Sequence, residues 1–335
     1  MASEWIIKEA ERLGFDACGI ANATALEEES THVEQWLEDE CEGEMGYLTR
    51  NKEKRYDPRL LVEGTKSIVT VLYNYYPKQS LDDSGCYKIA KYAYGADYHD
   101  VLKRKMRQLF EHIETQTGKL EGARIFVDSA PVLDRAWAVR CGLGFIGKNT
   151  MLIHPPLSLT ASRNHHNKDE IALEPTAGRS RRQCGGSFFF IGHLFLPLEL
   201  EETGKPLSNH CGRCTKCLDA CPTGALEAPF HIDARKCISY LTIEYKGSLE
   251  NHNPESFKGW MYGCDICQDV CPYNHFALPN MEPEFQPSEK LLAMRDDDWK
   301  NLNQADFEAL FKHSAVQRAG FEGLKRIIEF ISREN

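Results

Sequence analysis

The chain contains the stretch CGRCTKCLDACP, from Cys211 to Pro222, and later the stretch CDICQDVCP, from Cys264 to Pro272. With Cys237, these stretches place eight of the thirteen cysteines of the 335-residue chain between positions 211 and 271. The other five cysteines are scattered: Cys18, Cys41, Cys86, Cys141 and Cys184. Scattered cysteines are most often small buried hydrophobic residues. The N-terminus carries no export signal, so the eight crowded cysteines indicate a metal centre rather than disulfides.

The spacing is typical of bacterial two-cluster [4Fe–4S] proteins, in which three close cysteines bind one cluster and the cysteine before proline binds the other. This rule predicts two ligand sets: Cys211, Cys214, Cys217 and Cys271 for the first cluster, and Cys221, Cys237, Cys264 and Cys267 for the second. Zinc is the alternative, because Cys-x-x-Cys pairs also form zinc ribbons. Zinc ribbons do not usually carry a three-cysteine run and a Cys-Pro pair twice over, so the sequence favours clusters. Clusters with all ligands filled transfer electrons, and we expect the reaction itself in the preceding part of the chain.

Composition and charge limit the other classes of function. The chain is 42% hydrophobic and has a formal net charge of −10. No run of eighteen apolar residues is present, so we expect a cytoplasmic protein without a membrane segment. The acidic balance argues against a general basic surface for nucleic acid. Basic clusters at 103–107 and 179–182 are interpreted, on charge pattern alone, as solvated helix or loop charge.

Hydrophobic periodicity predicts alternating helices and strands. Helices are expected at 3–14, 33–37, 98–117, 132–141, 307–311 and 324–331, and strands at 15–21, 67–76, 124–127 and 186–194. This pattern favours an α/β or α+β domain. Residues 157–185 are polar and without periodicity, which is typical of an inserted loop. We therefore expect a catalytic domain at 1–206 with this insert, a cluster module at 207–276 and a short helical tail at 277–335.

Several motifs are similar to those of the epoxyqueuosine reductases. The motifs are KYAYGADYH (91–99), VDSAP (127–131), GLGFIGKN (142–149), GSF (186–188), CISYLT (237–242) and YGC (262–264). The resemblance covers roughly residues 3–330 apart from the insert. The glycine-rich motif also matches a dinucleotide fingerprint in spacing, but it follows a predicted helix rather than a strand, so it does not indicate a dinucleotide site.

The resemblance implies a cobalamin-dependent iron–sulfur enzyme related to reductive dehalogenases. Its expected fold is α+β: a nitroreductase-like cobalamin-binding domain, a bacterial-ferredoxin-like module with two [4Fe–4S] clusters, and a helical C-terminal tail. Electrons would pass through the clusters to cobalamin, and epoxyqueuosine at the wobble position of a tRNA would be reduced to queuosine. The implied partners are this tRNA and an external low-potential electron donor, and the expected state is a monomer.

The resemblance also assigns roles to single residues. Asp128 stands at the position of the proton donor, which requires a raised pKa. Without the resemblance, Asp128 would be interpreted as a strand-end residue capping the helix after Pro131. Arg135 is expected on the substrate side. The resemblance predicts these cofactor-binding residues: Arg55, with Arg59 as the alternative, and Asp97, Asp128, Asn149, Ser187 and Ser239.

Two other functions remain open from the sequence. One is a corrinoid iron–sulfur reductase that acts on a small molecule, as reductive dehalogenases do. The other is a ferredoxin-like electron carrier with an appended binding domain. Many relatives continue into a C-terminal helical-repeat region, so a chain ending at Asn335 is expected to offer less surface to tRNA.

Overall fold

The computed structural model describes residues 3–81, 85–156 and 184–334. The inserted loop predicted at 157–185, except for its last two residues, lies outside the described residues, as does the basic cluster at 179–182. Among the described helices, none combines the length and the apolar character needed to cross a membrane.

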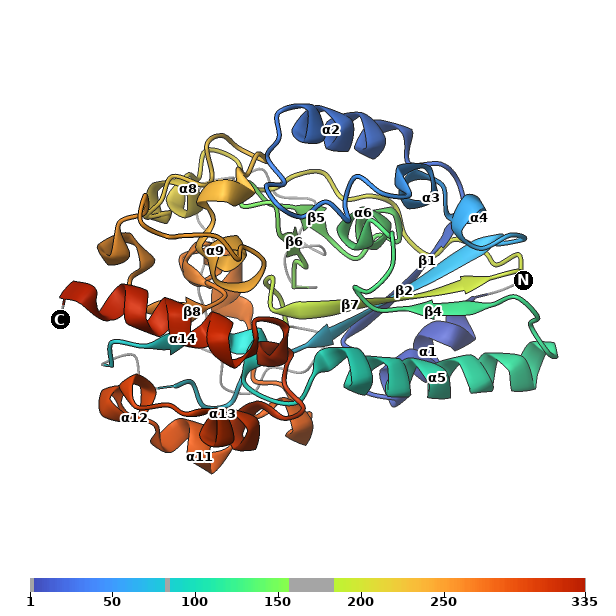
Figure 1. The fold of residues 1–335 in the computed structure, drawn as a ribbon. Helices are drawn as coiled ribbons and strands as arrows, with labels where there is room; N and C mark the ends of the chain where they lie inside the picture. The colour runs from blue at the N-terminus through green and yellow to red at the C-terminus, as the bar shows by residue number, and fades with distance from the viewer. Residues whose placement is uncertain (1–2, 82–84, 157–183, 335) are drawn as a thin grey trace.

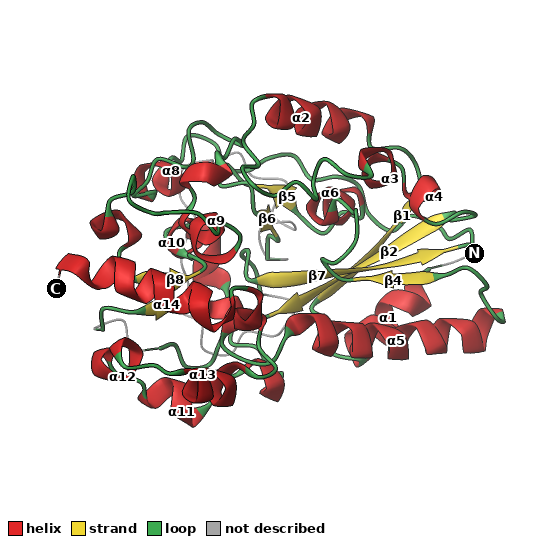
Figure 2. Ribbon diagram, viewed as in Figure 1, coloured by secondary structure: helices red, strands yellow, loops and turns green. Residues whose placement is uncertain are grey.

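A four-stranded antiparallel sheet forms the centre of one half of the molecule (Figures 1 and 2). Its strand order is β1 (Ala17–Asn22), β2 (Ser67–Asn74), β7 (Phe189–Leu196) and β4 (Arg124–Phe126). All eight residues of β2 are buried, which explains its continuous apolar and β-branched sequence. Antiparallel pairing throughout makes the arrangement α+β rather than α/β, in agreement with the predicted fold class.

Helices cover both faces of the sheet (Figure 1). On one face, α1 (Glu4–Arg12) and α5 (Tyr98–Thr117) pack against Val69 and Val71 of β2 in a common core. On the other face, α6 (Asp134–Arg140) packs against Ile68 and Leu72 in a second core. Neighbouring residues of β2 therefore point into different cores, as the two-residue repeat of a strand requires.

Three further helices and a short hairpin lie beside this sheet. The helices are α2 (Glu27–Glu38), α3 (Lys52–Tyr56) and α4 (Pro58–Leu61). The hairpin joins β5 (Phe145–Ile146) to β6 (Leu152–Ile153) and comes from the glycine-rich motif.

The cysteine-rich segment and the C-terminal tail form the other half of the molecule (Figure 1). Their helices are α8 (Lys216–Ala220), α9 (Ile238–Ile243), α10 (Ile266–Asp269), α11 (Glu289–Ala293), α12 (Asp296–Lys300), α13 (Gln304–Phe311) and α14 (Gly320–Ile331). Short 3-10 helices complete the described secondary structure: Lys91–Ala93, Ala234–Lys236, Pro254–Phe257, Pro272–Phe276, Pro283–Phe285, Ala315–Arg318 and Ser332–Glu334.

One segment from the N-terminal part belongs to this second half. β3 (Lys88–Ile89) pairs in parallel with β8 (Trp260–Tyr262). Residues 87–94 share a third core with α9, β8, α13 and α14. The chain therefore crosses from the first half to the second and back before α5 begins.

The structure corrects three predicted boundaries. The helix predicted at 33–37 begins at Glu27, where three glutamates occupy the first turn and favour the helix N-terminus. The helix predicted at 132–141 begins at Asp134, because the N–H of Val132 bonds to the carbonyl of Ala130 in a turn. The strand predicted from 186 begins at Phe189, since the backbone of Ser187 bonds to Asn274 instead.

Candidate active site and cluster-binding loops

Asp128 follows β4 directly and has an unusual backbone conformation. Its φ is +51°, in the left-handed region that non-glycine residues rarely adopt. Tyr98, the first residue of α5, donates a hydrogen bond from Oη to Oδ2 of Asp128, and Nε2 of His99 lies 3.8 Å from the same oxygen. The Tyr98 ring stacks on Phe190 of β7 at a centroid distance of 4.3 Å. The interpretation of Asp128 as a helix cap is wrong, because the N-cap of α6 is Leu133.

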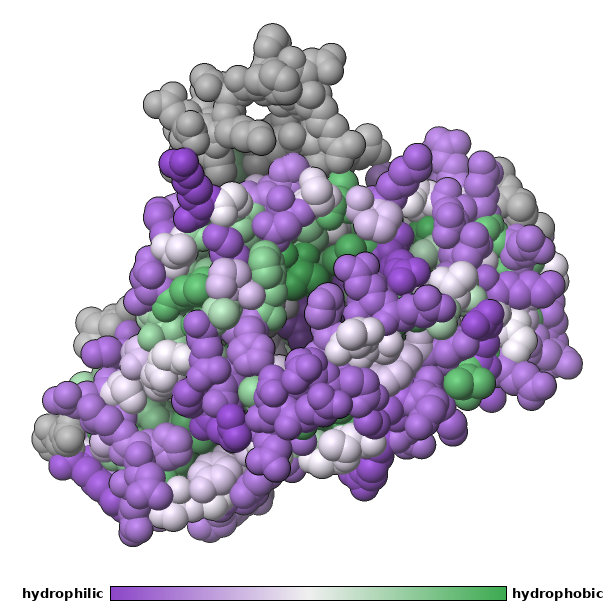
Figure 3. Space-filling view, turned by 90° about the horizontal axis from the view of Figure 1, so that it is seen from above, coloured by the Kyte–Doolittle hydropathy of each residue, from purple (hydrophilic) through white to green (hydrophobic). Residues whose placement is uncertain are grey.

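The surroundings of Asp128 favour its protonated form. Burial, and next the carboxylate of Asp134, raise the pKa of Asp128, while Tyr98, His99 and Arg135 oppose this rise. The side chain nevertheless keeps 60% of its surface open to solvent. Protein therefore surrounds the carboxyl but leaves one side of it open to solvent. Figure 3 shows a hollow with hydrophobic surface near the middle of the face seen from above.

A chain of hydrogen bonds runs from the core of the sheet to Asp134. His193 of β7 is fully buried, and its Nε2 lies 3.1 Å from Oδ1 of Asp134. Its Nδ1 lies 3.0 Å from the hydroxyl of Thr70 on β2, which accepts a hydrogen bond from the Cys141 thiol. Since the thiol donates to Thr70, the hydroxyl can donate to Nδ1, and a neutral His193 then donates from Nε2 to Asp134. This chain fixes the carboxylate that adjoins Asp128.

Two arginines lie close to this pair of carboxylates. Arg135 donates hydrogen bonds to the carbonyl and hydroxyl of Thr150, and the charges of Asp134 and Asp128 favour its cationic form. Arg55 is 8% exposed, and its Nε has no hydrogen-bond partner among the described residues. Burial lowers the pKa of Arg55, and Asp134 is the first group to oppose that change. The fold thus brings Arg55 and Arg135, two of the predicted residues, to the surroundings of Asp128.

The other predicted residues make structural contacts of their own. Asp97 caps α5, where its Oδ1 accepts hydrogen bonds from the backbone and the Nδ1 of His99. Ser239 lies in the first turn of α9, and its backbone N–H bonds to the sulfur of Cys237. Arg59, the alternative to Arg55, pairs with Asp57 on the surface, so the buried Arg55 is the better candidate.

The glycine-rich motif connects the sheet half to both cysteine loops. Nζ of Lys148 donates hydrogen bonds to the carbonyls of Gly212 at 2.8 Å and Cys214 at 2.9 Å. The next residue, Asn149, is buried and donates from Nδ2 to the carbonyl of Cys267 at 3.2 Å. Two neighbouring residues of one loop therefore hold both loops that carry the predicted ligands.

Ser187 adds a further link to the second cysteine loop. Its hydroxyl donates to Oε1 of Gln268 at 2.9 Å and accepts from Nδ2 of Asn274 at 3.0 Å. Asn274 also donates to the carbonyl of Gln268 at 2.6 Å. The side chains of Asn149 and Ser187 are thus engaged at the junction with the cysteine module.

The structure brings the eight cysteines together in two groups. The thiols of Cys211, Cys217 and Cys214 are the charged neighbours of Cys271, whose pKa is raised to about 11, first by burial. Cys237 and Cys221 are neighbours of Cys264, and Cys264 and Cys237 are the first charged neighbours of Cys267. Most of these neighbours fall within one predicted ligand set, and Cys217 of the first set also neighbours Cys267.

The cysteines also have the surroundings that iron ligands need. Although burial acts in the opposite direction, hydrogen bonds from the backbone of Leu226, Thr223 and Ala225 and from the Thr223 hydroxyl lower the pKa of Cys221. Such amides stabilise a thiolate, the form that binds metal. Among the described residues, no three His, Cys, Asp or Glu side chains converge closely enough for a single ion.

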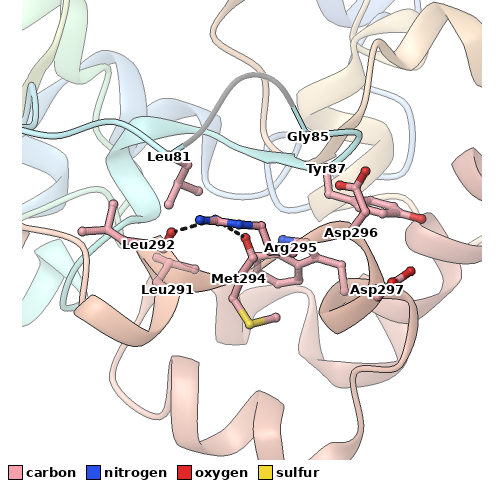
Figure 4. A pocket seen from close by; sticks show the side chains of 10 residues that line it. Leu81, Gly85, Tyr87, Leu291, Leu292, Met294, Arg295, Asp296 and Asp297 are labelled. Atoms are coloured by element: carbon pink, nitrogen blue, oxygen red, sulfur yellow. Dashed lines mark hydrogen bonds between the residues drawn. The ribbon is translucent and has the colours of Figure 1, made fainter.

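A separate cavity of about 320 Å³ lies away from all these residues (Figure 4). Leu81, Gly85, Tyr87 and the α11–α12 region line it. The side chain of Arg295 crosses the cavity and donates to the carbonyls of Leu292 at 3.3 Å and Met294 at 3.1 Å. None of the predicted site residues lines it, so we do not assign it to the reaction.

The cysteine groups, joined to an α+β domain with a protonatable carboxyl, define an iron–sulfur oxidoreductase. Residues 210–274 match the 4Fe-4S double cluster binding domain, and residues 55–129 match the family model described as Epoxyqueuosine reductase QueG, DUF1730. The chain belongs to the epoxyqueuosine reductase family.

Curated relatives and solved structures support this family assignment. Epoxyqueuosine reductases of Leadbetterella byssophila and Cellulophaga algicola are 47% and 44% identical to the chain. The matches cover 96% and 98% of this chain, and 95% and 97% of those proteins. The structure of epoxyqueuosine reductase from Streptococcus thermophilus has a TM-score of 0.79, and one with an epoxyqueuosine-modified tRNA-Tyr stem loop has 0.78. Both are 28% identical and cover 98% of this chain and 80% of theirs.

Sequence reasoning missed five residues that the structure brings into these sites: Tyr98, His99, Asp134, Lys148 and His193. Tyr98, His99 and Lys148 lie inside motifs that carried the family resemblance, so their place in a motif was a usable signal. His193 is one polar residue in an apolar strand, and Asp134 is an ordinary first-turn acid of a helix. Nothing local distinguishes those two, because their pairing joins residues far apart in the chain.

Proposed function

We propose that this protein reduces epoxyqueuosine in tRNA to queuosine, with two [4Fe–4S] clusters and cobalamin as cofactors. Membership of the family and the tRNA stem loop bound by a relative support this function. The observation that carries it is the open-sided Asp128 carboxyl with a raised pKa, in a chain that also holds two groups of four cysteines. The reaction consumes two electrons and two protons, and the epoxide oxygen leaves as water.

The described residues fit a bound corrin. The Nε of Arg55 is a buried donor without a partner, and a polar atom of this kind is costly unless a ligand satisfies it. Cobalamin, when bound, would supply a strongly nucleophilic reduced cobalt for opening the epoxide. We assign Arg55 first to the binding of cobalamin. Motif position supports the same assignment for Asp97, Asn149, Ser187 and Ser239.

In this proposal, each of the three parts of the chain has its own role. Residues 1–206, a nitroreductase-like domain in this proposal, would bind cobalamin. Residues 207–276 would carry electrons, and 277–335 would support that module. Cluster ligands would be the two groups already described, and a low-potential donor would supply the electrons to a monomeric enzyme.

Asp128 would deliver the proton to the leaving oxygen. The Tyr98 hydroxyl occupies Oδ2, so Oδ1 is the oxygen left to carry the proton. Burial and Asp134 keep the pKa of the carboxyl raised, which retains the proton until the reaction needs it. Arg135, the nearest cation on α6, would stabilise negative charge on the substrate side.

The test uses anaerobically purified protein with clusters and cobalamin, a strong small reductant, and tRNA that carries epoxyqueuosine. Queuosine formation, followed by nucleoside mass spectrometry, is the expected result. Replacing a general acid typically costs about 10²- to 10⁴-fold in rate, which sets the expectation for Asp128→Asn. Asp100→Asn, an exposed acid in the first turn of α5, is the matched control with unchanged turnover. Fully loaded protein that leaves epoxyqueuosine unconverted would refute the proposal.

A further inference from the structure

The two cysteine loops differ in their exposure to solvent. Gly212, Arg213, Thr215 and Lys216, which lie between the first three cysteines, are all exposed. In the second loop, Asp265 and Gln268 are buried and Ile266 is half-buried, while Asp269 is exposed. The first loop is thus part of the outer surface, and most of the second lies inside the molecule.

The second loop is buried because it packs against the sheet half. Asn149 bonds to the carbonyl of Cys267, and Ser187 bonds to Gln268. The segment 87–94 covers the loop from the second half: Nζ of Lys91 lies 3.5 Å from the buried Asp265, and the backbone N–H of Lys91 bonds to the same carboxylate at 2.8 Å. An electron that comes from outside therefore reaches the first cysteine group first, and the second group adjoins the proposed site of reaction.

The first loop carries two exposed cations, and an exposed aromatic residue is linked to the loop through Lys148. Arg213 and Lys216 flank Cys214, and among the described residues no carboxylate pairs with either of them. Phe230 is 50% exposed and has a φ of +67°, and its backbone N–H bonds to the carbonyl of Lys148 at 3.0 Å. Lys148 in turn bonds to Gly212 and Cys214, so Phe230 is connected to the first loop. We call Arg213, Lys216 and Phe230 the entry patch.

The backbone conformation of Phe230 is unfavourable, and the contacts of its own side chain do not offset this free energy. A non-glycine residue in the left-handed region is uncommon, and an exposed aromatic side chain gains little from burial. Aromatic and arginine side chains are, in contrast, the residues that contribute most at protein interfaces. The patch therefore has the chemistry of a small docking site.

We propose that the entry patch docks a small acidic electron-carrier protein, which delivers electrons to the first cluster. The chain has a formal net charge of −10, so an acidic carrier is repelled from most of the surface and attracted to this local cationic face. In each encounter the carrier loses one electron and the first cluster gains it, and no bond forms or breaks. Two electrons per turnover require repeated encounters, and small polar redox interfaces permit the fast dissociation that this demands. The inference rests on the clusters of the proposed function, but not on its substrate.

The test measures cluster reduction without tRNA. Reduced plant-type [2Fe–2S] ferredoxin of net negative charge is mixed with cluster-loaded protein. Its oxidation is followed by stopped-flow circular dichroism, in which the [2Fe–2S] centre gives a signal distinct from that of [4Fe–4S] clusters. The second-order rate is expected to fall at least tenfold in Arg213→Glu/Lys216→Glu and severalfold in Phe230→Ser. The double variant is also expected to lose the rate decrease that added salt causes in the parent. The affinity for oxidised ferredoxin at low salt, measured by calorimetry, should fall in parallel.

Controls separate docking from damage. Lys8→Glu/Lys119→Glu makes the same change in net charge on exposed lysines of the other half, and it should leave the rate unchanged. Photoreduced deazariboflavin, a small uncharged donor, should bleach all variants at the parent rate. An unchanged ferredoxin rate in the double variant overturns the proposal, and so does an equal loss with deazariboflavin. Weakened binding of tRNA by the double variant at an unchanged ferredoxin rate would assign the patch to RNA instead. If epoxyqueuosine reduction fails while these electron-transfer rates are as expected, the proposed function is refuted. The proposal for the entry patch is then unaffected.

Discussion

Replacing Lys148 by methionine should loosen the first cysteine loop while sparing the second. The change keeps an unbranched apolar stem and removes the terminal ammonium group, with its two hydrogen bonds to the carbonyls of Gly212 and Cys214. A hydrogen bond to a charged group contributes about 1.5–3 kcal/mol. The Gly212 carbonyl is exposed and water can replace the lost donor, whereas the Cys214 carbonyl is partly buried. We therefore expect a loss of about 2 kcal/mol, which corresponds to roughly 30-fold more frequent opening of this loop.

The assay is the release of iron to a chelator from anaerobic, cluster-loaded protein. Half of the cluster iron should leave about 30-fold faster in Lys148→Met, and the other half at the parent rate, because Asn149 still holds the second loop. Lys205→Met, at an exposed lysine without an ion pair among the described residues, is the control and should match the parent. Equal acceleration of both halves would mean that Lys148 does not act on the first loop, and an unchanged rate would refute the energetic argument.

Three further predictions concern the candidate active site and its supporting loop. Asp134→Asn removes a negative charge that acts on Asp128 and so lowers the raised pKa of Asp128. Because the protonated acid is the active form, the fall in turnover at high pH should move to lower pH. An unshifted pH–rate profile would contradict this. Arg55→Met should weaken cobalamin binding at least tenfold in a titration of corrin absorbance, with iron content as the control, since it removes the buried unpartnered donor. Gly144→Ala would push a methyl group into a backbone carbonyl of β6 and should cost about 1–3 kcal/mol, measured as a lower Tm, while Gly46→Ala meets no atom within 4 Å and should leave the Tm unchanged.

Part of the fold could be predicted because its signals are local. The helix at 98–117 was predicted at its observed bounds, since apolar residues recur at helical spacing and Gly118 follows its last residue. The continuous β-branched run at 67–74 likewise identified the central strand. Boundaries failed where a tertiary contact outweighed the local pattern. The strand predicted from 186 begins later because Asn274, far along the chain, binds the backbone of Ser187.

The sequence by itself determined the cluster chemistry and the family. Cysteine spacing and motif order are properties of short segments, so they can be recognised before any packing is known. Only the tertiary structure placed the Asp134 carboxylate beside Asp128, connected it through His193 to the core, and joined Lys148 to the first cysteine loop. Each of these contacts joins segments that are not neighbours in the chain. Their positions depend on how the sheet, α6 and the cysteine loops pack together, and a local pattern carries no information about that packing.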